Sequence, residues 1–357
     1  MRKLGYPRAL AGAVEAVASS GGQIMPPLMG AGAFVMVELT GTPYESVMAA
    51  ALIPALLYFA TVWIGLDAFA TRHELKPTPK ESRPPARAVI VTAAFFAVPF
   101  AVLLWGMFAA RDGRGYTPQY AAAMAILAAA ILLAFDAKGF VGARRFAGRV
   151  AAACLTAGRQ VALIASIILC ASIVIGVLGI TGLGVKITSL ILSGAGGMLW
   201  PALILTALAC LILGMEVPTT AAYVICVSVA GPALTDLGLE PLQAHLFVFW
   251  FALLSTITPP VCGAVFIAAG MVEENWLKVA FRAMALGAGL YIVPLAMIAR
   301  PELIRLEAAP LDAALSGVVA FAGLAALSWA LIARIGWARR AFLALAGAAL
   351  IFWPAAF

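Results

Sequence analysis

Three short polar segments carry the residues of this chain that could bind an ion. They read ASSGGQIMPPLMG (18–30), LGMEVPTTAAYVICV (213–227) and LLSTITPPVCGAVF (253–266), and each lies between apolar flanks. Serine and threonine supply hydroxyl oxygens, and a proline break frees backbone carbonyl oxygens. Hard cations such as Na⁺ can use oxygen ligands of this kind, by analogy with other hard ions. The residues that we take as candidate ligands on this ground are Ser19, Ser20, Thr256 and Thr258.

Two Pro-Pro pairs, Pro26-Pro27 and Pro259-Pro260, would keep the outer two segments open. Non-helical backbone at membrane depth is tolerated only where it lines protein or a water-filled cavity. The half-helix after each break points its positive N-terminal end at the gap, which favours an anion there. The alternative is that the prolines only kink packed helices, and the presence of two matched pairs argues against it.

The middle segment places one acidic residue in a long apolar region. Glu216 is the only acid between residues 187 and 235, and an ionisable group within a membrane is by default a functional hypothesis. The apolar runs 199–213 and 221–231 are each short for a span, so we predict a re-entrant hairpin with its tip at 214–220. The alternative is one long kinked span in which Glu216 snorkels or is paired.

The elements that position these segments are predicted to be membrane spans. Of the 357 residues, 64% are hydrophobic and 11% are charged, whereas soluble domains carry about 25% charged residues. Several apolar runs approach the roughly 20 residues that cross a bilayer. We therefore predict an all-α polytopic membrane protein of the inner-membrane type. Its runs include 44–66, 87–110, 158–180 and 199–213, with C-terminal spans near 283–299, 312–332 and 341–355.

The net charge of +7 comes from basic clusters between the apolar runs. Clusters at 70–87, 136–150 and 334–340 follow the positive-inside rule, which places them in the cytoplasm. Residues 137–157 are expected to form an amphipathic helix at that surface. The partner of this charge is the lipid bilayer, and nucleic acid is not an expected partner.

An internal repeat relates the first and last polar segments. Residues 13–36 and 247–271 each contain a Ser-Ser or Ser-Thr pair, then a Pro-Pro pair, then Gly-Ala and an apolar exit. Counting spans from the basic loops makes the two copies run in opposite directions. Inverted repeats with broken helices near the midplane are typical of secondary transporters.

The segments GYPRALAGAVEAVASSGGQIMPPLMGAGAF, GMEVPTTAAYV and LSTITPPVCGAVFIAAG resemble the large membrane subunit of tripartite ATP-independent periplasmic (TRAP) transporters. The resemblance covers about residues 4–305 and is greatest to the subfamily in which small and large membrane subunits are fused. It implies a sodium-driven importer of organic anions such as carboxylates, with an elevator-type fold. It also implies a periplasmic substrate-binding protein as partner, sodium as the coupling ion and no other cofactor.

The same resemblance implies which residues form the sites. The family's first broken helix corresponds to Ser19–Pro27, its second hairpin tip to Gly214–Thr220, and its second broken helix to Ser255–Pro260. The sodium site is expected where tip and second break meet, at Gly214, Glu216, Thr219, Thr220, Ser255, Thr256 and Thr258. The expected lining of the ion and substrate cavity is Ser19, Ser20, Gly21, Gly22, Gln23, Pro26, Pro27, Pro218, Pro259 and Pro260.

One departure from the family pattern concerns the start of the chain. In the fused subfamily several spans and a first hairpin precede the GYP segment, which here begins at Gly5. We therefore expect a partial fold, whose N-terminal permease portion and small subunit come from another chain. The alternative is a truncated product that does not function alone. The expected divisions are the end of the first repeat (1–43), spans with a cytoplasmic arm (44–157), the second repeat (158–300) and C-terminal accessory spans (301–357).

Two other classes of function fit the sequence less well. An intramembrane enzyme needs a nucleophile with a base, and the only histidines, His73 and His245, lie in no local motif with Ser or Cys. We therefore do not expect an enzyme. A passive channel needs an open polar pore, whereas paired breaks indicate occluded sites.

Overall fold

Helices make up nearly all the regular structure that the computed structural model describes, which covers residues 6–27, 29–73, 86–108, 116–136, 139–215 and 217–353. The described strands are two residues long each. The predicted all-α class is therefore confirmed. The chain divides into two compact units, one made of Met1–Lys76 with Ile167–Phe357 and the other of Pro77–Ser166.

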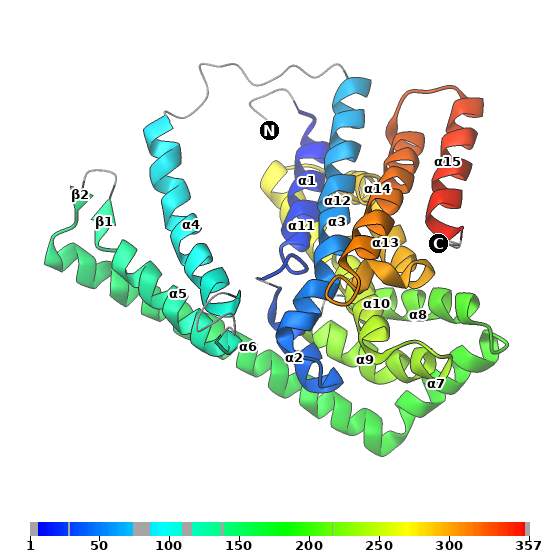
Figure 1. Ribbon diagram of the computed structural model, residues 1–357, viewed down its shortest axis with the longest axis horizontal. Coiled ribbons are helices and arrows are strands. Elements are labelled where there is room, and N and C mark those ends of the chain that lie inside the picture. The colour runs from blue at the N-terminus through cyan, green and yellow to red at the C-terminus, as the bar shows by residue number, and fades with distance from the viewer. Residues whose placement is uncertain are drawn as a thin grey trace. The chain divides into compact units, whose positions relative to one another are not determined.

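The first unit contains both Pro-Pro segments and the predicted hairpin (Figure 1). Its N-terminal elements are α1 (Arg8–Gly21), α2 (Ala31–Thr40) and α3 (Tyr44–Arg72). Its middle elements are α7 (Leu183–Gly194), α8 (Leu199–Leu213), α9 (Thr219–Asp236), α10 (Pro241–Leu254), η3 (Ser255–Ile257) and α11 (Gly263–Val272). Its last elements are α12 (Trp276–Leu286), α13 (Ala288–Ala299), η4 (Pro301–Ile304), α14 (Pro310–Ile332) and α15 (Trp337–Phe352).

Helix α10 forms the core of this unit. Phe247, Phe249 and Trp250 are fully buried, and the ring of Trp250 lies 6.4 Å from that of Tyr58 on α3 in an edge-on contact. A helix that is apolar on all sides is stable only when neighbours cover every face. The end of α10, where the second Pro-Pro segment begins, is therefore held inside the unit.

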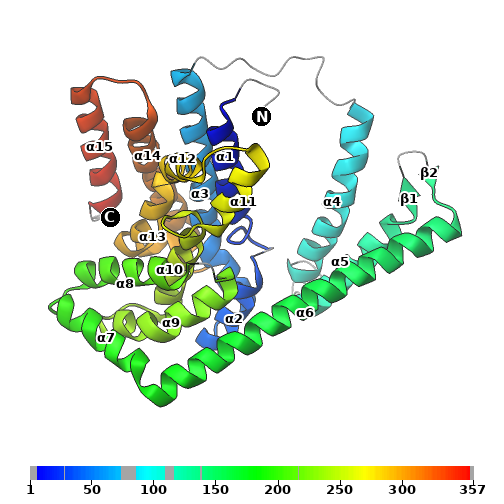
Figure 2. The same ribbon diagram turned by 180° about the vertical axis from the view of Figure 1, so that it is seen from behind.

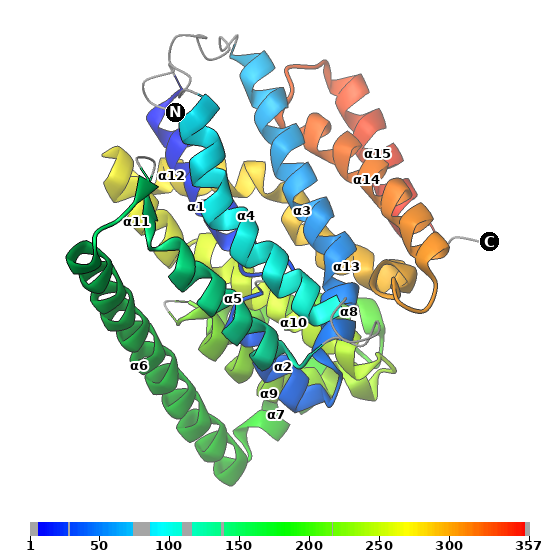
Figure 3. The ribbon, with the colours of Figure 1, turned by 60° about the vertical axis from the view of Figure 1, so that its left-hand side comes forward.

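The second unit contains α4 (Ala86–Phe108), α5 (Pro118–Leu132) and the two-residue strands β1 (Phe135–Asp136) and β2 (Gly139–Phe140). Helices α4 and α5 lie side by side (Figure 3). Gly106 of α4 lies close to Ala121 of α5. Helix α6 (Ala143–Thr181) begins in this unit and runs for 39 residues. The helix continues through the predicted division at 157/158, because the sequence from 143 to 181 contains no proline and only isolated glycines. The division itself stays a prediction.

Among the described residues, two helices are long and apolar enough to cross a membrane, namely α3 and α14. Helices α12 and α13 are together long and apolar enough for a third span, but the chain bends by 40° at the break between them. The bend corrects the prediction of one span at 283–299. It lies at Gly287, where an added Cβ would be 2.9 Å from the Ala283 carbonyl oxygen, so only glycine fits without displacement.

The C-terminal helices pack onto the long helix α3. Helix α14 lies along α3, and α15 lies along α14 (Figures 1 and 3). Gly323 and Gly347 let the last two helices approach closely, because a Cβ on either residue would lie within 2.8 Å of the other's carbonyl oxygen. Small residues at a crossing are typical of helix pairs in membranes.

The buried side chain of Arg300 connects the end of α13 to the end of α15 through hydrogen bonds. Its Nε donates to the Ile351 carbonyl at 3.2 Å, and its Nη2 donates to the carbonyls of Leu350 (2.8 Å) and Trp353 (3.1 Å). These carbonyls lie in the last turn of α15 and just beyond it, where no helical donor follows and the helix dipole is negative. The cation therefore satisfies the C-terminus of α15.

We predict that Arg300→Met lowers the free energy of unfolding by about 1–3 kcal/mol, because carbonyl groups lose their donor in a buried setting. The matched control is Arg305→Met, which removes an ion pair to Glu240 between two half-exposed side chains and should cost at most about 1 kcal/mol. Thermal unfolding in detergent measures both variants. Equal unfolding temperatures for the two variants would contradict the role of Arg300.

Two basic regions share one end of the first unit. Arg72, the last residue of α3, donates to the Ile332 carbonyl at 3.1 Å, and Arg340 at the start of α15 donates to the Ala333 carbonyl at 3.2 Å. The end of α3 and the α14–α15 connection therefore lie together, as two clusters on the same side of a membrane require. Their cytoplasmic orientation stays a prediction.

Candidate ion and substrate site

The two Pro-broken helices lie against each other in opposite directions. Arg8 at the start of α1 forms an ion pair with Glu273 at the end of α11. Further along α1, Gly12 faces Val272 and Ser20 contacts Thr256. Beyond the break, Gly32 of α2 packs on Phe249 of α10. As the residue number rises in one broken helix, the partner's number falls in the other. This antiparallel pairing is the arrangement that opposite-running repeats require.

The breaks share the same local chemistry. After α1, the backbone amides of Gly22, Gln23 and Ile24 donate to the carbonyls three residues earlier, and the regular helical ladder then stops. After α10, the short helix η3 ends with the Thr258 amide donating to the Ser255 carbonyl at 3.4 Å. Both Pro-Pro bonds are cis. Each broken helix therefore ends in a tightened turn followed by non-helical backbone.

The breaks meet through two hydroxyl groups. The Oγ of Ser20 lies 3.4 Å from the Oγ1 of Thr256, although the two residues are 236 positions apart. Each hydroxyl also lies within hydrogen-bond distance of a carbonyl in its own helix, Ser20 to Ala16 at 2.9 Å and Thr256 to Leu253 at 2.8 Å. A hydroxyl has one hydrogen, so donation to the helix leaves its lone pairs available. Two acceptor oxygens then lie side by side.

The hairpin tip meets the second break at a buried contact. Helices α8 and α9 lie beside each other (Figure 2). The Cys226 thiol of α9 lies 3.7 Å from the Cys210 carbonyl of α8. At the end of α8, the Gly214 carbonyl accepts a hydrogen bond from Ser255 Oγ at 3.0 Å. Ser255 is fully buried, and an added Cβ on Gly214 would overlap its side chain. The tip and the break are therefore in direct van der Waals contact.

The remaining predicted ligands are distributed around this contact. Thr258 Oγ1 lies 2.6 Å from the Leu254 carbonyl and 2.6 Å from the Tyr291 hydroxyl. Thr219 and Thr220 begin α9 and are half-buried, and no hydrogen bond joins their hydroxyls to another described residue. Glu216 lies outside the described residues. No cluster of three or more His, Cys, Asp or Glu side chains is present among the described residues, and the oxygens in the contacts above belong to hydroxyl groups and backbone carbonyls.

The predicted cavity residues of the first break face different ways. Ser20, Gly21 and Pro27 are buried, Gln23 and Pro26 are half-buried, and Ser19 and Gly22 are exposed. Around the other two segments, Pro259 is half-buried, whereas Pro218 and Pro260 are exposed. Gly21 is required by packing, because a Cβ there would lie 2.7 Å from both Phe59 and Tyr58. Of the two serines, only Ser20 contacts the second break.

The helix ends at this place determine its electrostatics. The C-terminal ends of α1, α8 and α10 meet through the Ser20–Thr256 and Gly214–Ser255 contacts. Helix C-termini carry partial negative charge, which favours a cation. The helices α2, α9 and α11 begin after the same three interruptions, and helix N-termini favour anions. The site therefore combines carbonyl and hydroxyl oxygens with nearby helix ends of both signs.

A family model described as "Tripartite ATP-independent periplasmic transporter, DctM component" matches residues 1–311. The chain belongs to this family. The resemblance to a TRAP large membrane subunit is thereby confirmed, and the chain is a multi-pass membrane permease component of a transporter. Among curated proteins, none matches the chain. The more detailed predictions of a fused subfamily and of a C-terminal half stay predictions.

The match to the DctM component includes all three interruptions and stops at the start of α14. The ion and substrate residues named above therefore all lie within the family region. Helix α15 and nearly all of α14 lie beyond it. The assignment of residues 301–357 as accessory stays a prediction, although α14 packs along α3.

Sequence reasoning missed the tyrosines that hold the breaks of this DctM component in place. The Tyr44 hydroxyl donates to the Pro27 carbonyl at 2.7 Å, and the Tyr58 hydroxyl donates to the Val17 carbonyl at 2.7 Å. The Tyr291 hydroxyl contacts Thr258, and the Tyr223 hydroxyl lies 2.7 Å from His245 Nδ1. Isolated tyrosines in apolar runs look like core or interface residues. A usable signal is that a buried tyrosine hydroxyl needs a partner.

Proposed function

We propose that this chain is the membrane permease subunit of a sodium-coupled importer of organic anions, with carboxylates as the substrate class. The observation that supports it best is the meeting of two antiparallel broken helices and a hairpin tip at Ser20, Thr256, Ser255 and Gly214. Secondary transporters bind their substrate and coupling ions at such interruptions. Membership of the DctM family supports the transport class.

In this proposal the sodium ion is bound by hydroxyl and carbonyl oxygens near the ends of α1, α8 and α10. Ser20 and Thr256 are 3.4 Å apart, which is close to the spacing of neighbouring oxygens when metal–oxygen distances are about 2.4 Å. The half-buried hydroxyls of Thr219 and Thr220 and the oxygen of Thr258 are further proposed ligands. These hydroxyl and carbonyl oxygens suit a hard cation such as Na⁺, and the carboxylate of Glu216 is a further proposed ligand.

The anion is proposed to bind beside the ion, at the N-terminal ends of α2, α9 and α11. Backbone N–H groups at a helix start are unpaired and point outward, which suits a carboxylate. Bound sodium would add positive charge to the same place, so ion and substrate would each favour binding of the other. Coupling of this kind is reciprocal, and it gives a measurable signature.

The proposed partners follow the tripartite description of the family. They are a periplasmic binding protein that delivers the organic anion, and a small membrane subunit. The proposed location is the bacterial inner membrane, and the proposed transport step is an elevator-type movement. Which carboxylate is carried depends largely on the binding protein, so dicarboxylates, amino acids and sugar acids are all test substrates.

The experiment is uptake by proteoliposomes that contain this chain with its partner subunits and the loaded binding protein. An inward sodium gradient should drive accumulation of a radiolabelled carboxylate, and a potassium gradient of equal size should not. Direct binding of radioactive sodium to the purified chain provides a second measurement that needs no substrate. Equal uptake in the two gradients would contradict sodium coupling, and absence of carboxylate uptake in both would contradict the proposed substrate class.

A further inference from the structure

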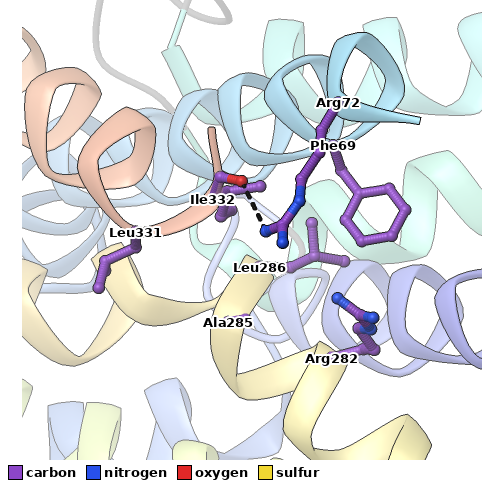
Figure 4. Close-up of a pocket in the computed structure, with 7 residues that line it drawn as sticks. All are labelled: Phe69, Arg72, Arg282, Ala285, Leu286, Leu331 and Ile332. Atoms are coloured by element: carbon purple, nitrogen blue, oxygen red, sulfur yellow. Dashed lines mark hydrogen bonds between the residues drawn. The ribbon is translucent and has the colours of Figure 1, made fainter. Parts of the chain in front are cut away.

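A pocket lined by none of the predicted ion and substrate residues lies where three helices end or turn at the basic end of the first unit. It has a volume of about 110 Å³. Phe69 and Arg72 of α3, Arg282 and Leu286 of α12, and Leu331 and Ile332 of α14 line it (Figure 4). A water molecule needs only about 10–15 Å³ by this kind of measure, so the pocket has room for a larger polar group.

Two arginines give this pocket a positive charge that the described residues do not neutralise. Arg72 donates to the Ile332 carbonyl at 3.1 Å, and the Arg282 guanidinium lies 5.0 Å from the centre of the Phe69 ring (Figure 4). Within the described part of the chain, neither guanidinium forms an ion pair with a carboxylate. Their remaining N–H groups can therefore donate to a ligand.

His73, which follows α3 directly, lies close enough to the two arginines for their charge to affect its pKa. Its ring stacks on Phe69 at a centroid distance of 4.2 Å. Desolvation lowers the pKa of the His73 imidazole, and the positive charges of Arg282 and Arg72 lower it further. A ligand with negative charge in the pocket would oppose this effect of the two arginines.

The rest of the lining indicates where the ligand comes from. The floor is apolar, since Phe69, Leu286 and Ile332 are buried, and Leu331 is 55% exposed at the rim. The pocket lies at the ends of α3 and α14, the two helices that are long and apolar enough to span a membrane. The end of such a helix lies at the level of lipid headgroups, where basic pockets between helices bind anionic headgroups.

We propose that Arg72 and Arg282 bind the phosphate group of an anionic phospholipid headgroup, with the lipid's apolar part passing over Leu331. A guanidinium donates two parallel hydrogen bonds to phosphate, and two guanidinium groups on different helices can contact different oxygens. The lipid would thereby join α3, α12 and α14 at this end. A free phosphate ester offers the same oxygens, so the experiment must separate the two sources.

The test is native mass spectrometry of the detergent-purified full chain titrated with dioleoyl phosphatidylglycerol, with dioleoyl phosphatidylcholine as the zwitterionic comparison. The wild-type chain should bind phosphatidylglycerol more tightly. The double variant Arg72→Gln/Arg282→Gln should weaken that binding by about 100-fold or more, since each of the two lost charge-assisted hydrogen bonds contributes about tenfold or more. The double variant Arg72→Lys/Arg282→Lys keeps both charges but loses the paired hydrogen bonds, so its affinity should lie between those of the wild type and the glutamine variant.

The matched control is Arg339→Gln, which removes an exposed arginine at the start of α15 that does not line the pocket. It should leave phosphatidylglycerol binding unchanged. Equal phosphatidylglycerol binding by the wild type and by a double glutamine variant with the wild-type melting temperature would overturn the phosphate site. Displacement of lipid by millimolar glycerol phosphate, without preference for phosphatidylglycerol, would assign the pocket to soluble phosphate esters and overturn the lipid assignment.

Discussion

Replacing Gly214 with alanine is expected to raise the sodium concentration for half-maximal uptake by up to about 150-fold. An added Cβ would lie 2.9 Å from Ser255 Cβ and 2.9 Å from the Cys210 carbonyl oxygen, and it would overlap Ser255 Oγ. Neither neighbour can move easily, because Ser255 is fully buried and Cys210 is within α8. The hairpin tip must then shift away from the second break, and such overpacking costs about 1–3 kcal/mol.

The expected effect comes from steric overlap of the added methyl group with its neighbours and not from the backbone conformation of Gly214. Gly214 has φ −81° and ψ −5°, which alanine adopts readily. The matched control is Gly270→Ala near the C-terminal end of α11, where an added Cβ meets nothing within 4 Å. Sodium titration of uptake in proteoliposomes compares the two variants. A wild-type sodium dependence for Gly214→Ala, at equal membrane expression, would show that the tip–break contact does not form the ion site.

The second large effect is expected at the hydroxyl pair between the breaks. Thr256→Val keeps the shape of the side chain and removes one oxygen, and Ser20→Ala removes the other. Each change should raise the sodium concentration for half-maximal uptake by about 5- to 150-fold, since the loss of a buried ligand costs about 1–3 kcal/mol. Carboxylate affinity at saturating sodium should change much less. Thr258→Val and Thr220→Val test the other proposed ligands in the same assay.

Combining the two changes separates a shared ion from two independent structural roles. If one sodium bridges Ser20 and Thr256, the double variant should fall well short of the product of the single effects, because coupled residues are not additive. Thr235→Val is the control, since its hydroxyl bonds to the Pro232 carbonyl at 3.0 Å at the far end of α9. Full additivity, or an equal effect in Thr235→Val, would be evidence against a bridging ion.

The places where the three broken helices stop can be read from the amino-acid sequence. Each apolar helix ends five residues before a proline, and the Gly, Ser and Thr residues in between also weaken it. Proline alone is not sufficient, because Pro54, Pro99, Pro232 and Pro294 lie inside helices. The interruptions were therefore predictable to within a few residues, and so was the helix α8 at 199–213. The family followed from the same segments, since their residue order is specific. All of this information is local along the chain.

Which of these residues contact one another can be seen only in the tertiary structure. Ser19 and Ser20 are chemically alike and adjacent, but successive residues of a helix point about 100° apart, so only Ser20 reaches Thr256. The partners of Tyr44, Tyr58 and Tyr291 likewise depend on how helices pack. The bend at Gly287 also depends on how the helices pack. The physical reason is that long-range packing fixes helix rotation and approach, which no spacing within one segment encodes.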